Sequence, residues 1–566
     1  MERKKFIVAC NGVKLNPSPD NAKYVELLHN HDLTSTNNVK IELQNFVTNI
    51  FTLSDRKKDL MEIAGYIFAA DRKCSRGNDK EIIYDNWSRD IEIHIKVRDL
   101  HFWQDTQVIK ALNEALTFMT GDFNFNFVFY KYEDDHKYNL FDNDNFVVEP
   151  TAKTKVVLFS GGLDSLAGII ELLETTENQL WLVSHQSGNP SVAQTQKNLF
   201  EEIKSLYPNR SYHYKYKCGL TGQQRADENQ RTRSFLFNSI AFVLSTTYGH
   251  NENLLFENGI TSFNFPESED MQNSRASRTT HPKTLALLMN LFSLIEGKPY
   301  KIYNGFVFKS KTDVMEILKN FNKLNLLSIA VSCSATRINI GSRTHCGICS
   351  QCIDRRFASY SAEVENFDET GLYHFDFVTQ VLDSDDKKKA LSNYINLTKI
   401  FYKSNLDSFN FDFSPQIIDI ENYLSGNTDS ERILKIFELC QRHGKQVEKA
   451  LGRMSEKHDK AFSDYKENSL FDLILGMRGA SAPKSNSQQP QIDENTTREL
   501  GNAQEIIKKQ KLKIKTLSNP LTHSELFALS EKTKKKNGSI NYSAIAKNLG
   551  ISNHTAKQWC RLYKIS

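Results

Sequence analysis

The chain has 566 residues, with 72 Lys and Arg against 68 Asp and Glu, so its formal net charge is +4. So small an excess does not in itself indicate a nucleic-acid-binding protein. The mean hydropathy of −0.50 and the lack of a long apolar run exclude a membrane-spanning protein. The length suffices for three or four domains, and no secretory signal precedes Lys4-Lys5-Phe6-Ile7, so we expect a cytoplasmic location.

Residues 1–150 have an organisation of their own and are expected to form an α+β domain. The sequence predicts an amphipathic helix at 60–68 and an alternating strand at 91–97. A further strand carries four aromatic side chains on one face: Phe123, Phe125, Phe127 and Phe129. Such a row of rings can stack on nucleic-acid bases, but the burial preference of Phe favours a place in the core.

The most informative segment is 155–165, Lys-Val-Val-Leu-Phe-Ser-Gly-Gly-Leu-Asp-Ser. An apolar strand ends at Ser160, two glycines follow, and a helical apolar pattern begins near Ser165. The glycines let the backbone approach an anion, the helix N-terminus offers unpaired N–H groups, and the serines add hydroxyl donors. We therefore expect a pyrophosphate-binding loop, and the alternative is a glycine turn that only joins a strand to a helix. The spacing fits neither a Walker loop nor a dinucleotide-binding fingerprint.

Strands and helices alternate regularly around and after this loop. Apolar strand runs lie at 155–159, 179–184, 212–217, 253–256 and 300–304. Helical patterns lie between and after them, near 165–174, 191–206, 231–248, 283–296 and 312–320. This alternation implies an α/β domain with a doubly wound parallel sheet, which we place at residues 151–365. His185 and Gln186 follow the second strand, where a nucleotide base would lie, and a buried structural histidine is an equal alternative.

Four of the nine cysteines fall between residues 333 and 352, at a spacing typical of metal ligands. Thiolates at i, i+3 and i+6 can wrap one face of a tetrahedral metal while a fourth arrives from an earlier turn. Four sulfurs suit Zn²⁺, and less well an iron–sulfur cluster. A reducing compartment makes disulfides a poor interpretation. The expected ligands are Cys333, Cys346, Cys349 and Cys352.

The two motifs together resemble the ATP pyrophosphatase family, and within it 7-cyano-7-deazaguanine synthase (QueC). The resemblance rests on Ser-Gly-Gly-x-Asp-Ser at 160–165 and on Cys-Gly-x-Cys-x-x-Cys-x-x-Arg-Arg at 346–356. A Lys-containing helix start at 309–317 and an Arg-led helix at 233–241 are also similar to that family. The similarity covers about residues 153–365 and implies the PP-loop, HUP-like form of the α/β fold.

The resemblance implies that ATP is a cofactor and that the loop holds its pyrophosphate part. The implied pyrophosphate site consists of Ser160, Gly161, Gly162, Leu163, Asp164 and Ser165. Within it, Asp164 and Ser165 are the catalytic candidates, and Asp164 is expected to help hold Mg²⁺. As a loop carboxylate, Asp164 is expected to contribute little to packing. The family's zinc is structural, so the four cysteines are expected to be ligands of Zn²⁺ rather than catalysts.

The resemblance also implies a reaction. Members of the family split ATP into AMP and pyrophosphate to adenylate an oxygen of their substrate. We expect a ligase or synthase that adenylates a carboxylate, on a 7-deazaguanine, and passes the acyl group to ammonia or a protein amine. An N-terminal extension of such proteins in bacterial antiviral defence operons is similar to residues 66–72, 76–77, 87 and 97–98. The family often forms homodimers. The alternatives are 7-cyano-7-deazaguanine biosynthesis, tRNA or DNA modification, and a nucleic-acid-binding scaffold without turnover.

The substrate pocket departs from the family's pattern. Biosynthetic members carry Tyr-Pro-Asp-Cys-Arg where this chain has Phe-Pro-Glu-Ser-Glu-Asp at 265–270. Glu257 and Asn258 follow a predicted strand, at the place where open α/β sheets bind ligands. A polar segment supplies further candidates for binding a carboxylate or phosphate: Arg275, Arg278, Thr279, Thr280 and His281. The alternative is a loop that only caps the helix beginning near Pro282.

Beyond the cysteine segment the chain is expected to be mainly helical. Residues 366–478 show Leu, Ile and Phe periodicity, with Arg442-His443-Gly444 interpreted as a helix end. A linker with a basic helical patch follows at 479–520. Residues 521–566 resemble a helix-turn-helix, with helices at 542–549 and 553–559 around a glycine turn.

In this terminal module Ala546, Leu549, Ile551 and Ala556 are the expected inward contacts. Lys557, Gln558 and Arg561 would lie on or near a recognition helix, and Lys532–Lys536 would contact the phosphates of DNA or RNA. The alternative is a helical hairpin that docks on a protein.

Overall fold

The computed structural model describes residues 4–15, 22–29, 38–42, 53–76, 88–132, 153–186, 190–221, 231–266, 278–334, 343–426, 428–458, 466–479 and 542–549. The chain divides into two compact units, Met1–Gly479 and Ala480–Ser566. The first unit contains the two sheets and the predicted site, and α19 (Tyr542–Leu549) is the described element of the second.

The central sheet of the first unit has six strands in the order β10-β9-β6-β7-β8-β3. The first five in this order run parallel: β10 (Lys301–Asn304), β9 (Glu252–Leu255), β6 (Thr154–Leu158), β7 (Gln179–His185) and β8 (Ser211–Leu220). The sixth, β3 (Val39–Glu42), pairs antiparallel with β8. The predicted parallel α/β sheet is thus confirmed, because each of the five apolar runs forms one of its parallel strands.

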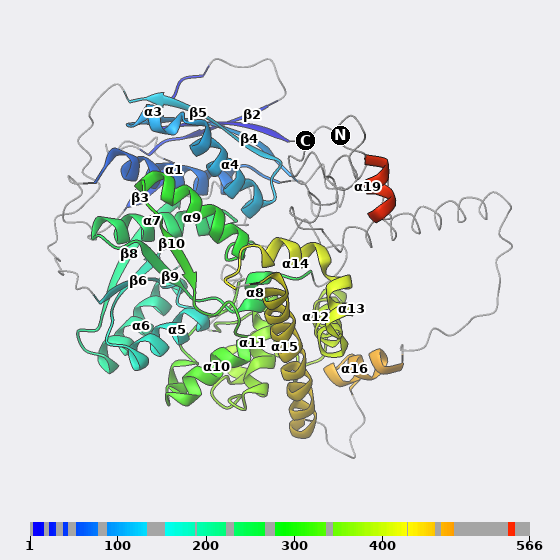
Figure 1. Ribbon diagram of the computed structural model, residues 1–566. Helices are drawn as coiled ribbons and strands as arrows, with labels where there is room; N and C mark the ends of the chain where they lie inside the picture. Colours follow the sequence, from blue (N-terminus) through cyan, green and yellow to red (C-terminus); the bar gives the residue numbers. More distant parts are fainter. Residues whose placement is uncertain are drawn as a thin grey trace. The chain divides into compact units, whose positions relative to one another are not determined.

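Helices cover both faces of this sheet (Figure 1), as expected for parallel strands that are apolar on both sides. On β6, Val157 packs into one helical layer and Val156 into the other. The first layer contains α5 (Leu163–Thr175), α6 (Pro190–Leu206) and α10 (Lys311–Asn320). The second contains α7 (Arg233–Thr247) and α9 (Pro282–Glu296). All five helices begin and end within a few residues of the bounds expected from the sequence.

A second sheet, of four strands in the order β2-β1-β4-β5, is built by the N-terminal part. Its strands are β1 (Lys5–Cys10), β2 (Lys23–Leu27), β4 (Asp90–Val97) and β5 (Asn124–Lys131). Its helices are α1 (Asp55–Lys73), α3 (Leu100–Trp103) and α4 (Thr106–Thr120), of which α1 contacts α7 and α4 contacts α9. The four strands pair in parallel, so the expected α+β class is wrong for this part. An alternating pattern predicts a strand but does not indicate whether the neighbouring strand runs parallel or antiparallel to it.

The aromatic row of β5 belongs to the core, as its burial preference indicated. Phe125, Phe127 and Phe129 are buried in the same hydrophobic cluster as α1 and α4. Phe123 precedes β5 and is 55% exposed. The row therefore offers no continuous platform for bases.

Several contacts cross the domain boundary predicted near residue 150, among them a strand pairing and buried hydrogen bonds. β3 belongs to the N-terminal part but pairs with β8 in the central sheet. Asp71, in α1, accepts hydrogen bonds from the N–H and the hydroxyl of Thr232, over 3.1 and 3.2 Å, just before α7 begins. Asp71 also belongs to a buried cluster of ion pairs with Arg76, Arg89 and Asp122. The N-terminal part is thus joined to the α/β core by a strand and by buried polar contacts.

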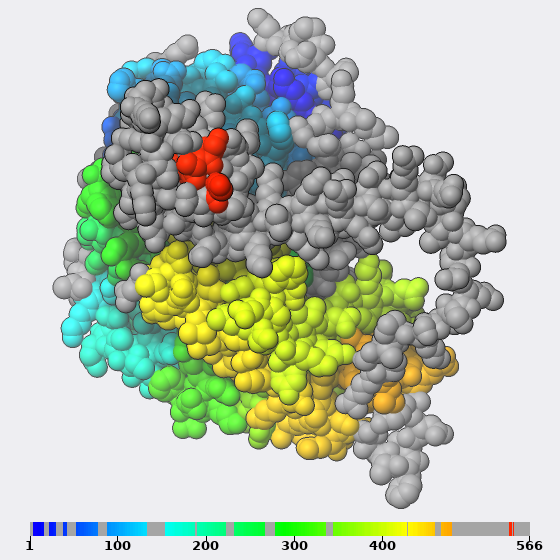
Figure 2. All heavy atoms as spheres, turned by 45° about the vertical axis from the view of Figure 1, so that its right-hand side comes forward, coloured from blue at the N-terminus to red at the C-terminus, as the bar shows by residue number. Residues whose placement is uncertain are grey.

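Residues 385–479 are mainly helical, in agreement with the helical periodicity predicted for 366–478. The helices of this extension are α12 (Asp385–Lys403), α13 (Leu406–Asp412), α14 (Ser414–Glu421), α15 (Asp429–His458) and α16 (Leu470–Gly479). Figure 2 shows much of this extension as a continuous block of atoms, coloured yellow to orange. Further elements near the site are α8 (Gly259–Phe263), α11 (Ser350–Ser361) and the 3-10 helices η3 (Leu324–Leu326) and η4 (Thr370–Leu372).

The interpretation of Arg442-His443-Gly444 as a helix end is wrong, since these residues lie in the middle of α15. A Cβ on Gly444 would lie 2.6 Å from the backbone nitrogen of Tyr402 in α12. Glycine is therefore required here for the close approach of two helices, and not for helix termination.

No helix in the described ranges is long and apolar enough to cross a membrane. In the second unit, α19 coincides with the first helix of the expected helix-turn-helix. The expected recognition residues Lys557, Gln558 and Arg561 and the basic segment Lys532–Lys536 lie outside the described residues. The helix-turn-helix therefore stays a prediction.

Candidate functional site

The expected pyrophosphate loop lies at the carboxyl end of β6 and leads directly into the 13-residue helix α5. Gly161 has a φ of +84°, and a Cβ there would lie 3.1 Å from Cγ of Gln196, so conformation and space both favour glycine. The N–H of Gly162 donates to Ser160 Oγ over 3.1 Å, and Ser165 Oγ lies 3.0 Å from Ser160 Oγ. Hydroxyl and amide groups thus gather at a helix N-terminus, an arrangement suited to an anion.

Asp164 lies in the first turn of α5 and is buried. Nζ of Lys311, the first residue of α10, lies 2.8 Å from its Oδ1 and 2.9 Å from its Oδ2. The backbone N–H and the side-chain amide of Asn258 both donate to Oδ2, over 3.1 and 2.9 Å. The expectation that Asp164 contributes little to packing is therefore wrong. Its carboxylate joins α5 to two segments that are distant in the sequence.

The surroundings of Asp164 determine its charge. Burial raises the pKa of its carboxyl, but the charge of Lys311 and hydrogen bonds from Glu257, Lys311 and Asn258 outweigh burial and lower this pKa to about 2. Burial lowers the pKa of Lys311, but the charge of Asp164 outweighs it and raises that pKa. Both members of the pair are therefore charged at neutral pH.

Glu257 and Arg233 form the solvent-accessible side of this cluster. Glu257 follows β9 and is partly exposed, and burial together with the charge of Asp164 raises its pKa well above the usual range. Glu257 therefore keeps its proton at a pH where an ordinary glutamate has lost it. Arg233, the first residue of α7, is exposed, although desolvation lowers its pKa.

The expected role of Asp164 as a magnesium ligand does not fit this geometry. Both of its oxygens accept hydrogen bonds from Lys311, and one accepts two more from Asn258. An ion on Asp164 would have to displace these donors.

Three side chains complete the cluster that sequence reasoning did not name as site residues: Lys311, Thr261 and Gln351. Gln351 Oε1 lies 3.5 Å from Lys311 Nζ, and its amide donates to Thr261 Oγ1 over 3.1 Å. The sequence does indicate that Lys311 begins a helix, because Ser310 and Asp313 have the Ser-x-x-Asp spacing of a helix capping box at the start of α10. Thr261 and Gln351 carry no such signal, since only the tertiary fold brings them together.

The polar segment before α9 contacts the N-terminal part. Arg278 donates to the carbonyl of Phe118 over 3.2 Å, and its guanidinium lies 4.8 Å from the centre of that ring. His281 is the N-cap of α9 and accepts from the N–H of Lys283 over 3.2 Å. These are the contacts of the capping segment that was the alternative to a binding loop. Arg275 lies outside the described residues.

His185 lies at the end of β7 and is buried. Its Nε2 is 2.8 Å from the carbonyl oxygen of Cys218, and its ring contacts those of Phe68, Tyr216 and Phe237. Burial lowers its pKa to about 4. These contacts are those of a structural histidine.

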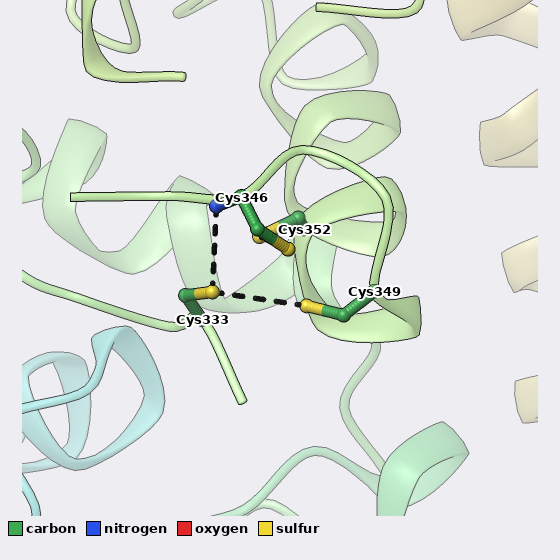
Figure 3. Close-up of side chains that lie close together, drawn as sticks. All are labelled: Cys333, Cys346, Cys349 and Cys352. Atoms are coloured by element: carbon green, nitrogen blue, oxygen red, sulfur yellow. Dashed lines mark hydrogen bonds between the residues drawn. The ribbon is translucent and has the colours of Figure 1, made fainter. Parts of the chain in front are cut away.

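The four cysteines converge on one point, as predicted (Figure 3). Their Sγ atoms lie within 4.8 Å of one another, with 4.0 Å between those of Cys333 and Cys349 and 3.9 Å between those of Cys346 and Cys352. Four sulfurs at about 2.3 Å from a tetrahedral Zn²⁺ are about 3.8 Å apart. The site can therefore hold a metal ion such as Zn²⁺ with little rearrangement.

The turn before α11 shapes this metal centre. Gly347 has a φ of +88°, and a Cβ there would lie 1.6 Å from the carbonyl oxygen of Phe375, so no other residue fits. Cys349 is the N-cap of α11 and Cys352 lies in its first turn. The N–H of Cys346 donates to Sγ of Cys333 over 3.4 Å.

The segment that carries the first cysteine also supports the pyrophosphate loop. The N–H of Val331 donates to the carbonyl of Gly161 over 3.2 Å. Arg355 of α11 fixes the same segment by donating to the carbonyl of Ala330 over 2.7 Å and by pairing with Asp368 over 2.8 Å. The metal centre and the loop are therefore joined by a short stretch of backbone.

Comparison with known proteins does not show a family. No family model and no curated protein matches the chain. A solved structure, a ketoreductase domain from the bacillaene assembly line, is similar over 58% of this chain and 76% of that chain, with 10% identity and a TM-score of 0.16. A similarity this weak carries no argument about fold or function.

Proposed function

We propose that the chain is an ATP-dependent ligase or synthase of the ATP pyrophosphatase type, with the PP-loop form of the α/β fold. It adenylates a carboxylate on a 7-deazaguanine, releases pyrophosphate and transfers the acyl group to an amine. One observation carries this proposal: the serine and glycine loop at the N-terminus of α5 contains Asp164, whose buried partner is Lys311. Amide and hydroxyl donors next to a fixed lysine suit the phosphates of ATP.

In the first step, an oxygen of the substrate carboxylate attacks the α-phosphorus of ATP. The bond from this phosphorus to the bridging oxygen breaks, and pyrophosphate leaves with the electron pair. The donors of Gly161, Gly162 and Ser165 stabilise the charge that develops on the leaving group. Lys311 and Asp164 stay charged as a buried pair, which fixes the first turn of α5 beside these donors, so that they need no reorganisation during the step.

In the second step, the amine nitrogen attacks the acyl carbon. The bond to the AMP oxygen breaks, AMP leaves with that electron pair, and the nitrogen loses a proton to solvent. ATP enters as its magnesium complex, in which Mg²⁺ is carried by phosphate oxygens. We assign no carboxylate of the chain to this ion.

The position of Phe265 supports a rebuilt substrate pocket. This residue stands where biosynthetic members carry the tyrosine of their substrate-binding stretch, and here it is buried. Its ring centre lies 5.5 Å from that of Phe401 and 5.1 Å from that of Phe413, both in the helical extension. The segment thus anchors the extension, which favours the extended, antiviral defence type over ordinary biosynthesis. We further propose that the enzyme is cytoplasmic and uses a protein amine as acceptor. Its proposed assembly is a homodimer, and the proposed partner of its C-terminal module is DNA or RNA.

The experiment is to incubate the purified chain with ATP, Mg²⁺ and 7-deazaguanine-7-carboxylate, and to measure AMP and pyrophosphate. Parallel reactions contain ammonia, a peptide with a free amine, or tRNA. We expect AMP to depend on the carboxylate and not on tRNA. Stimulation by tRNA would favour nucleic-acid modification, and no AMP under any condition would favour the scaffold alternative.

A further inference from the structure

The helical extension holds the start of α10. Ser310 and Asp313 form a capping box, in which the N–H of Ser310 donates to Asp313 Oδ2 over 2.9 Å. Gln446 of α15 contacts both members, because it accepts from Ser310 Oγ over 2.6 Å and donates to Asp313 Oδ1 over 2.7 Å. Arg442, one turn earlier on α15, donates to Asp313 Oδ2 over 3.1 Å and to the carbonyl of Phe308 over 2.7 Å. Two side chains of α15 therefore fix the N-cap of α10 and the strand-to-helix turn before it.

The same helix also holds the segment that follows β9. Asn258, which donates to Asp164, is the N-cap of α8. The N–H of Gly259 donates to the carbonyl of Lys309 over 2.8 Å. A Cβ on Gly259 would lie 2.1 Å from the carbonyl oxygen of Val307 and 2.5 Å from Cδ2 of Leu439, a residue of α15. The start of α8, the turn before α10, and α15 thus pack with no space for a further side chain.

We propose that Gln446 and Arg442 are positioning residues for Lys311, so that the helical extension is part of the catalytic body. The inference rests on the proposed function, which assigns Lys311 to the ATP site. Lys311 directly follows the N-cap Ser310, so its backbone moves with the capping box that α15 holds. A displacement of about 1 Å at a reacting group costs about 100-fold in rate. The two α15 side chains act through the capping box and do not themselves reach Asp164 or the loop.

The test compares Gln446→Leu with Glu448→Ala in the full chain. Gln446→Leu removes both hydrogen bonds to the capping box while keeping most of the side-chain volume. Glu448 is exposed on the same helix and serves as the matched control. For Gln446→Leu we expect kcat for AMP formation to fall about 10- to 100-fold. The KM for ATP should stay within about threefold, because the loop itself is untouched. Arg442→Lys should recover much of the rate lost in Arg442→Ala.

Hydrogen exchange over residues 308–320 gives a measure that does not depend on turnover. Faster exchange in Gln446→Leu than in Glu448→Ala supports the positioning role. If no condition yields AMP but Gln446→Leu still exchanges faster, the proposed function is wrong, while the stabilisation of the start of α10 by α15 is supported. Equal exchange and equal kcat in the two variants would overturn the inference, and so would a rate loss accounted for entirely by unfolded protein.

Discussion

Nζ of Lys311 lies 2.8 Å from Oδ1 and 2.9 Å from Oδ2 of Asp164, and both side chains are buried. The pair joins the first turns of α5 and α10, which are 147 positions apart in the sequence. Removing one member leaves a buried charge without compensation. The pair therefore determines both the stability of this region and the charge at the proposed ATP site.

Replacing Lys311 with Met should abolish AMP formation and lower the free energy of unfolding by about 3–5 kcal/mol, because Asp164 would remain buried without the ammonium group. Asp164→Ala should cost less, because the carboxyl of Glu257 can then lose its proton more readily and compensate Lys311. Urea unfolding and AMP formation by the soluble fraction measure the two effects.

Lys309→Met is the matched control for this change. Lys309 lies two positions away in a partly exposed pair with Glu171, with 3.5 Å between the charged atoms. Its loss should cost less than about 1 kcal/mol. Equal costs for the two lysines would contradict the role of the buried pair.

His213, a partly buried histidine of β8, should make the protein less stable as the pH falls. Burial lowers the pKa of His213 to about 3, and its ring contacts those of Phe159 and Phe200. The folded state then binds fewer protons than the unfolded state between pH 6.5, the ordinary histidine value, and the folded pKa. The stability that His213 contributes is present above pH 6.5 and is lost as the pH falls, at about 1.4 kcal/mol per pH unit.

The check on this prediction is His213→Asn, which cannot take up the proton. The difference in unfolding free energy between the parent and this variant should decrease by about 2 kcal/mol from pH 7 to pH 5. Urea unfolding at the two pH values measures it. A difference that does not change with pH would show that His213 titrates normally in the folded protein.

The cysteine centre should bind about one Zn²⁺ per chain, the number expected of one Cys₄ site. Cys349→Ser should lower both metal content and solubility, because metal binding contributes folding free energy. It should also weaken ATP binding, since the adjoining Val331 donates to Gly161 of the loop. Elemental analysis and ATP binding measure these effects.

A buried cysteine outside the centre provides the control for this change. Cys440→Ala should leave the zinc content unchanged, because Cys440 lies in α15. An iron chromophore in the visible range, or an unchanged metal content in Cys349→Ser, would contradict a zinc site.

Removing all residues after Gly479 should leave ATP turnover intact, because the first compact unit ends there and contains every site motif. If the fragment 480–566 binds DNA or RNA, its affinity should fall steeply with salt as phosphate counterions are released. Binding assays at two salt concentrations test this. A fragment without salt-sensitive binding would favour protein docking, and loss of turnover on truncation would show that the tail belongs to the catalytic unit.

Local patterns in the sequence predicted the parts of the fold that depend on local interactions. The strand β6, the glycine turn and α5 follow one another within a few residues, so periodicity and turn residues suffice to identify them. Three of the four cysteines lie in one turn and the helix start after it, so their spacing alone indicated a metal centre.

The remaining features depend on contacts between distant segments. Lys311 meets Asp164 only because β10 lies beside β9 and β9 beside β6 in the central sheet. The place of β3 next to β8 and the hydrogen bonds of Gln446 to the start of α10 arise in the same way. The spacing of residues within one segment cannot show which residues of a distant segment they contact. The sequence therefore predicted the loop and the cysteines, but not the residues that hold them in place.

If the chain transfers AMP to a carboxylate, one oxygen atom of that carboxylate ends on the AMP and can be followed by isotope labelling. The measurement uses 7-deazaguanine-7-carboxylate labelled with oxygen-18 in its carboxyl group, with ATP, Mg²⁺ and an amine acceptor, and determines the mass of the AMP formed. If a carboxylate oxygen attacks the α-phosphorus and remains on it when the amine displaces AMP, the product AMP contains one oxygen-18. AMP without the label, or ADP and phosphate in place of AMP and pyrophosphate, would show that the chain does not adenylate this carboxylate.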